Sequence, residues 1–135
     1  MTLTDFFKLY GVAIVTFLII DMIWLGLVAR SFYQAQMGHL MRANVNWAAA
    51  GVFYLVFVAG VVILAVRPAI ENQSLTQALV LGAVLGLVTY AAYDLTNLAT
   101  LEGFPLTVAL VDLVWGTVLC STVSAVTYLA SRVLA

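Results

Sequence analysis

Four long apolar runs constrain this chain more than any other feature of its sequence. They cover approximately residues 6–28, 47–66, 77–101 and 106–130, and each is long enough to cross a bilayer as an α-helix. Lipid offers the backbone no hydrogen-bond partners, so spanning segments of this length must be helical. The sequence therefore predicts an all-α, polytopic membrane protein. We expect one transmembrane domain over residues 1–135, an up-down bundle of four helices.

The composition agrees with lipid as the solvent of this surface. Hydrophobic residues make up 65% of the chain and charged residues only 8%, against about 25% charged residues in soluble domains. The formal net charge is −1 and the five basic residues do not cluster, which excludes a nucleic-acid partner. The bilayer is the expected partner, and a homodimer or a larger membrane complex is left open.

The three connections between the runs each predict a local structure. The second begins at Arg67-Pro68, where we expect the proline to end the second helix. The third, residues 102–105, is a tight turn that joins the last two spans into a hairpin. The first carries apolar side chains at helical spacing and predicts a short interfacial helix between the first and second spans. These side chains are Tyr33, Met37, Leu40 and Met41.

Basic residues in the connections and tails indicate the orientation. In an up-down bundle three of them fall on the side of the termini and two on the opposite side. Since cytoplasmic segments carry the excess of Lys and Arg, we expect both termini in the cytoplasm of a bacterial inner membrane. The three are Lys8, Arg67 and Arg132, and the two are Arg30 and Arg42.

Three aspartates, Asp21, Asp94 and Asp112, lie inside the predicted spans. Charged side chains are rare within spans and often mark a functional site. Counting from the nearest connection at 1.5 Å per residue places each of them about 10–14 Å below the same membrane face. We therefore predict a layer of three carboxyl groups in the half of the bilayer that lies away from the termini.

Asp94 and Asp112 each continue a ridge of small residues. Steps of four residues lead from Asp94 to Gly86 and Gly82, and from Asp112 to Gly116. Small residues allow transmembrane helices to approach closely. We expect the last two helices to pack ridge against ridge, with both aspartates directed into the bundle.

Other side chains at this depth extend the layer into a predicted one-sided polar pocket for a ligand or an ion. Tyr93 and Asn97 lie beside Asp94 in sequence, and Trp24 and Trp115 lie deeper than interfacial tryptophans usually do. Three ionised carboxylates would repel one another, so protonation, a bound cation or an arginine must balance them. Arg30 is the nearest basic residue in sequence.

The residue inventory argues against most cofactors. One histidine and one cysteine cannot supply the usual ligands of haem, zinc or an iron–sulfur cluster. No glycine-rich phosphate loop is present, which argues against a nucleotide. No metal is assigned, although aspartate oxygens would suit a hard cation better than zinc.

Three motifs resemble a known family. They are Asp21-Met-Ile-Trp-Leu-Gly26, Tyr93-Asp-Leu-Thr-Asn-Leu-Ala-Thr100 and Asp112-Leu-Val-Trp-Gly116. Together they resemble a bacterial family of small four-span membrane proteins catalogued as domain of unknown function 2177, over essentially the whole chain. The resemblance implies the four-span architecture and an inner-membrane location, and it brings no reaction.

Three functional hypotheses follow. In the first, the aspartate layer binds or moves a cation, a proton or a small ligand. In the second, the protein is a membrane enzyme or enzyme subunit acting on a lipid or apolar substrate, with Asp94 and Asp112 as a general acid/base pair. In the third, it is a structural subunit of a larger membrane complex, in which the aspartates only fix the bundle.

Overall fold

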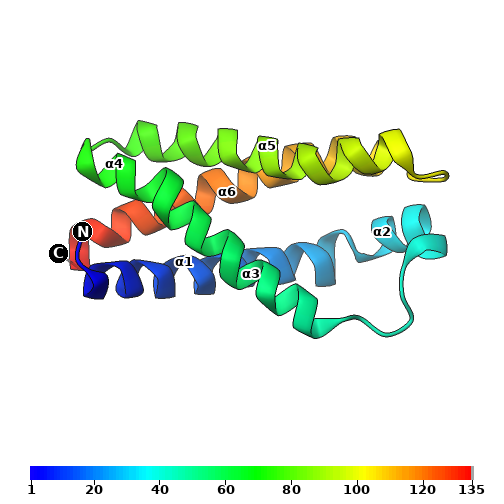
Figure 1. Ribbon diagram of the computed structural model, residues 1–135, viewed down its shortest axis with the longest axis horizontal. Coiled ribbons are helices and arrows are strands. Elements are labelled where there is room, and N and C mark those ends of the chain that lie inside the picture. The colour runs from blue at the N-terminus through cyan, green and yellow to red at the C-terminus, as the bar shows by residue number, and fades with distance from the viewer. Residues whose placement is uncertain (135) are drawn as a thin grey trace.

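The computed structural model describes residues 1–134, and every regular element in this range is a helix. Four helical segments are long and apolar enough to span a membrane, at Leu3–Val28, Trp47–Glu71, Leu75–Thr100 and Leu106–Leu134. The predicted all-α architecture with four spans is therefore confirmed. Figure 1 shows both termini at one end of the bundle and the turn between the last two helices at the other.

The first two spans each contain a π-helical turn. The first consists of α1 (Leu3–Ile23) and the turn η1 (Trp24–Val28). The second runs through α3 (Trp47–Val61), the turn η3 (Val62–Val66) and α4 (Arg67–Glu71). A π-helical turn holds one residue more than an α-helical turn, and this rotates the part of the helix that follows it. Each span therefore presents different faces before and after its π-helical turn.

The expectation that Pro68 ends the second helix is wrong. The helix continues to Glu71, and Pro68 lies in the first turn of α4, immediately after η3. In the turn, the Arg67 amide donates to the Val62 carbonyl five residues earlier. A proline in the first turn of a helical segment costs little because its missing N–H group would have no α-helical partner there.

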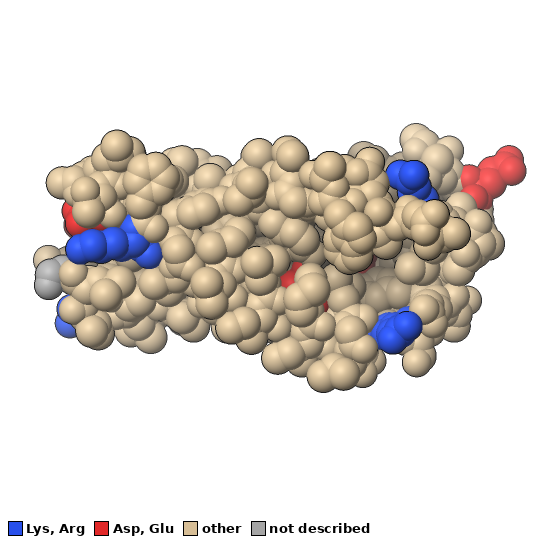
Figure 2. Space-filling view, turned by 90° about the horizontal axis from the view of Figure 1, so that it is seen from below, with Lys and Arg blue, Asp and Glu red and all other residues tan. Residues whose placement is uncertain are grey.

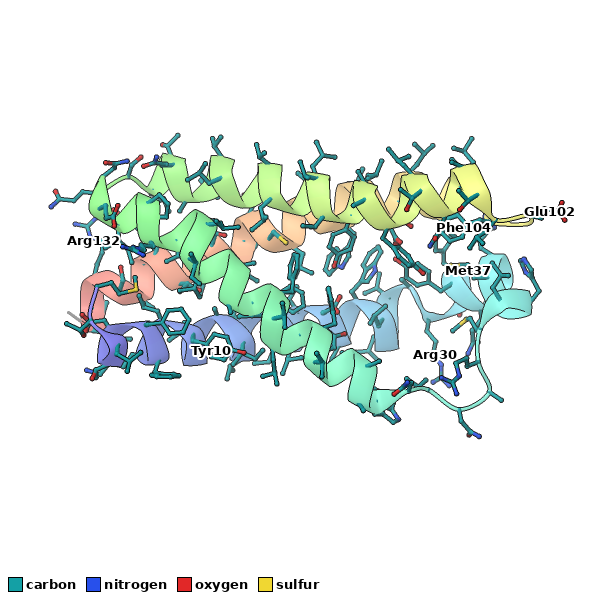
Figure 3. The ribbon with its side chains drawn as sticks, viewed as in Figure 1. Tyr10, Arg30, Met37, Glu102, Phe104 and Arg132 are labelled. Carbon is teal, nitrogen blue, oxygen red and sulfur yellow. The ribbon has the colours of Figure 1, made fainter. Side chains whose placement is uncertain are left out.

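The short helix predicted between the first two spans is confirmed as α2 (Arg30–Met37), followed by the 3-10 turn η2 (Gly38–Leu40). Tyr33 and Met37 pack against the buried cluster of Phe104, Val108 and Ala109 beside the hairpin turn, and Figure 3 shows Met37 and Phe104 together at this end of the molecule. Leu40 is exposed. The apolar side of α2 thus covers the end of the hairpin.

α5 (Leu75–Thr100) and α6 (Leu106–Leu134) form that hairpin and touch along much of their length. A β-carbon on Gly82 would lie 2.6 Å from the Cys120 carbonyl oxygen, and one on Gly86 would overlap the Gly116 carbonyl group. Gly116 in turn faces the ring of Tyr90. At Gly86 the two backbones are therefore close enough that no side chain fits between them, and at Gly116 the ring of Tyr90 fills the space that a side chain would need.

α1 lies along α6, and α3 crosses α1 obliquely before diverging from α5 (Figure 1). The interior of the bundle is mostly apolar on the side of the termini, where Phe17, Val58, Val62, Leu119 and Val123 are buried together, although Ser124 and Thr127 are also buried on this side. The buried aspartates lie beyond this core, toward the end at which α3 and α5 separate.

Candidate intramembrane carboxylate site

Asp94 of α5 is completely buried, and neither of its carboxyl oxygens has a hydrogen-bond partner among the described residues. Asp112 of α6 is close enough for the two carboxyl groups to interact electrostatically, and to share a hydrogen bond when one of them carries a proton. A buried carboxyl group without a donor is costly in an apolar surrounding. The fold alone therefore does not satisfy Asp94.

Asp112 is held from the connection between the first two spans. The hydroxyl of Tyr33 donates to Asp112 Oδ1, and the indole Nε1 of Trp24 donates to the Tyr33 oxygen over 3.2 Å. Burial, together with the bond to Asp112, raises the pKa of Tyr33 above its usual range. The phenol therefore keeps its proton and remains a donor to Asp112 at physiological pH.

Asp21 of α1 differs from the other two aspartates because both of its oxygens are occupied. Tyr54 of α3 donates to Oδ2 over 3.0 Å, and Trp115 Nε1 of α6 donates to Oδ1 over 3.2 Å. Asp21 thus ties three helices together. It faces Trp115, which is about one helical turn farther from the hairpin turn than Asp112.

Two stacked tryptophans connect these two groups of hydrogen bonds. The rings of Trp24 and Trp115 lie nearly parallel, with centroids 4.3 Å apart and an interplanar angle of 10°. Trp24 donates on the side of Tyr33 and Asp112, whereas Trp115 donates to Asp21. The aromatic stack therefore joins the hydrogen bonds of Asp21 to those of Asp112, and these two aspartates also interact electrostatically.

A cavity of about 340 Å³ lies between α3 and α5 and reaches Asp112. Aromatic rings form most of its wall, and it is partly open to the outside. Its lining residues are Phe53, Phe57, Thr89, Tyr90, Tyr93 and Asp112. Figure 2 shows acidic atoms recessed about midway along the molecule, whereas the Lys and Arg side chains on that face lie toward the two ends.

The structure brings only some of the predicted pocket residues to this cavity. Asp112 and Tyr93 line it, and Asp94 lies behind Asp112. Asn97 is half-buried one turn from Asp94. Arg30 is exposed and makes no hydrogen bond or ion pair with the residues that the structure describes, so the structure does not bring it to the carboxyl groups.

Six residues of the site were not identified from the sequence as part of it, among them Thr89 and Tyr90, which line the cavity from α5. Phe53 and Phe57 form the α3 wall, Tyr54 binds Asp21, and Tyr33 binds Asp112. In a span as uniformly apolar as residues 47–66, no periodic signal distinguishes the inward face. Tyr33 did carry a signal, since it is a polar aromatic residue on the apolar side of a short amphipathic helix.

Within residues 1–134, no group of three or more His, Cys, Asp or Glu side chains is arranged to hold a metal ion. The site consists of two neighbouring carboxyl groups, with the third engaged elsewhere. A larger hollow of about 440 Å³ lies at the other end of the bundle, near the termini. Its walls carry charges of both signs, from Asp5, Lys8, Arg67 and Glu71.

Comparison with known proteins identifies a family for the chain. No curated protein and no solved structure matches it. Residues 6–129, which include all three aspartate motifs, match the family described as "Predicted membrane protein (DUF2177)", and the chain therefore belongs to this family of membrane proteins.

Proposed function

We propose that this membrane protein binds a cation inside the bilayer at Asp94 and Asp112, and that the cation exchanges with a proton on the same pair. The observation that supports this proposal is the Asp94 carboxyl group, which is fully buried, has no hydrogen-bond donor and lies beside a second carboxyl group. The pair is incomplete without a positive partner.

The energetic argument rests on charge. An ionised carboxylate in a low-dielectric interior costs several kcal/mol unless a partner compensates it, and a second carboxylate nearby increases that cost. Tyr33 supplies one hydrogen bond to Asp112 but no charge. A proton or another cation can neutralise the pair, and competition between the two provides a mechanism of exchange.

Asp21 provides an internal comparison for a structural aspartate. Both of its oxygens accept hydrogen bonds, from Tyr54 and Trp115 on two other helices. Asp94 accepts no bond from a tyrosine, tryptophan or other neutral donor among the described residues, and its contact on another helix is the carboxyl group of Asp112. The contrast favours a binding role for Asp94 over a role in fixing the bundle.

Labelling with dicyclohexylcarbodiimide tests the proposal. This lipid-soluble reagent converts a protonated carboxyl group within a bilayer into a stable N-acylurea. In protein reconstituted in lipid at mildly acidic pH, we expect peptide mass spectrometry to locate the adduct on Asp94 or Asp112. We expect the Asp94→Asn/Asp112→Asn variant to lose the adduct. A cation bound at the pair should protect both carboxyl groups from labelling.

Glu102 at the hairpin turn is the matched control within the same chain, because its side chain is exposed and lies between the last two spans. Figure 3 shows Glu102 at the outer end of the hairpin. Labelling of Glu102 equal to that of the pair, or no labelling of the pair across the pH range, contradicts the proposal.

We also propose a bacterial inner-membrane location with both termini in the cytoplasm. Lys8, Arg67 and Arg132 support this orientation under the positive-inside rule, against two basic residues toward the opposite end. A C-terminal fusion to green fluorescent protein should fluoresce, and a C-terminal fusion to alkaline phosphatase should be inactive. An active phosphatase at the C-terminus contradicts the proposed orientation.

A further inference from the structure

We propose that the cavity between α3 and α5 takes an organic cation with an apolar body, which enters sideways from the lipid. This inference rests on the proposed function and names the chemical class of its ligand. Three features carry it: the aromatic wall, the carboxyl group at the floor and the position of the opening.

The wall of the cavity suits a weakly hydrated cation. Four of its six lining residues are aromatic, with Phe53 and Phe57 on α3 facing Tyr90 and Tyr93 on α5. The two phenylalanine rings lie 5.2 Å apart between centroids with an interplanar angle of 24°. Aromatic faces attract ammonium groups, most strongly where water is excluded.

The polar groups of the cavity point to the same ligand class. Asp112 is its one acidic lining residue, with Asp94 behind it. Thr89 adds little, because its hydroxyl already donates to the Leu85 carbonyl over 2.8 Å. A small hydrated metal ion would find few oxygen ligands here, whereas an anion would meet two carboxyl groups.

The opening faces the membrane. Phe53 and Tyr93 are 47% and 55% exposed on the outer faces of two spanning helices. Phe53 follows the start of α3 by about 9 Å, and Tyr93 precedes the end of α5 by about 10 Å. A ligand with an apolar body can therefore reach the cavity from the lipid side, and about 340 Å³ is at the lower end of small-molecule sites.

Two probes that differ in charge alone test this inference. Benzyltrimethylammonium and neopentylbenzene have the same shape, with a quaternary nitrogen in the first replaced by carbon in the second. With the protein in phosphatidylcholine nanodiscs, saturation-transfer NMR and equilibrium dialysis should show saturable binding of the cation, about tenfold or more tighter than any binding of the hydrocarbon.

Two substitutions locate the binding. Asp112→Asn should weaken binding of benzyltrimethylammonium about tenfold or more, provided that the variant still elutes as a folded protein. Phe53→Leu preserves an apolar side chain at an exposed position. It should weaken binding of benzyltrimethylammonium about three- to tenfold, because the ring face is lost. Phe7→Leu is the matched control, since Phe7 is 61% exposed on α1 near the termini, and should leave binding unchanged.

The outcomes separate this inference from the proposed function. Equal binding of the two probes, or equal effects of Phe53→Leu and Phe7→Leu, overturns the inference. If sodium protects the Asp94–Asp112 pair from carbodiimide but benzyltrimethylammonium does not bind, the inference fails and the proposed function stands. If the pair neither reacts with carbodiimide nor binds the cation, both fail.

Discussion

Replacing Gly86 by alanine is expected to destabilise the protein by about 1–3 kcal/mol, the usual cost of forcing extra volume into a close-packed interior. The new β-carbon would overlap the carbonyl group of Gly116, so the obstacle is backbone that no side-chain rotation can remove. α5 and α6 must then move apart. Because they carry Asp94 and Asp112, the substitution should also disturb the carboxyl pair.

Gly60→Ala is the matched control for that experiment. Gly60 lies in α3, and nothing comes within 4 Å of the position of its β-carbon. Alanine there should be neutral or stabilise the helix by up to about 1 kcal/mol. Unfolding of both variants in mixed micelles of increasing dodecyl sulfate, followed by tryptophan fluorescence, measures the difference. Equal stability of the two variants contradicts the close contact at Gly86.

The spans could be predicted from the sequence because the bilayer sets their length and composition directly. The observed ends differ by a few residues. Thr2 caps α1 by accepting from the Asp5 amide, which moves the start of that helix ahead of the apolar run. The close approach of α5 and α6 also has a local signal, since Gly82, Gly86 and Gly116 recur at helical spacing.

The cavity wall could not be predicted, because its residues are apolar in a span where nearly every residue is apolar. Phe53 and Phe57 reach the cavity only because α3 crosses the bundle obliquely and diverges from α5. The angle of that crossing depends on side-chain contacts across the bundle. The π-helical turn before Pro68 has no sequence signal beyond the proline, and it changes a predicted helix end into a continuous helix.

The aspartates show how far a depth count can reach. Residue counting places Asp21, Asp94 and Asp112 at similar depth, and it cannot say which of them find donors. That depends on rotation about each helix axis and on partners such as Tyr33 and Tyr54 from other segments. The division into one satisfied aspartate and one unsatisfied pair is therefore a property of the tertiary structure.

Leucine in place of Asp94 is expected to stabilise the fold while removing binding at the pair. Leucine has the same branched shape, needs no hydrogen bond and ends the repulsion from Asp112. Replacing buried charged groups by apolar ones often adds about 1–4 kcal/mol of stability, and the substitution leaves no neutral donor unpaired, because none among the described residues donates to Asp94. Carbodiimide labelling at position 94 and saturable binding of benzyltrimethylammonium should both fall.

Asp21→Leu should have the opposite effect on stability. It leaves the Tyr54 hydroxyl and the Trp115 indole N–H without their acceptor, at about 1–3 kcal/mol for each unsatisfied buried group. The same dodecyl sulfate titration compares the two variants. If Asp94→Leu destabilises the protein as much as Asp21→Leu does, Asp94 acts in fixing the bundle and the proposed binding role is wrong. If only Asp21→Leu destabilises, the two carboxyl groups have separate roles, one in the fold and one in binding.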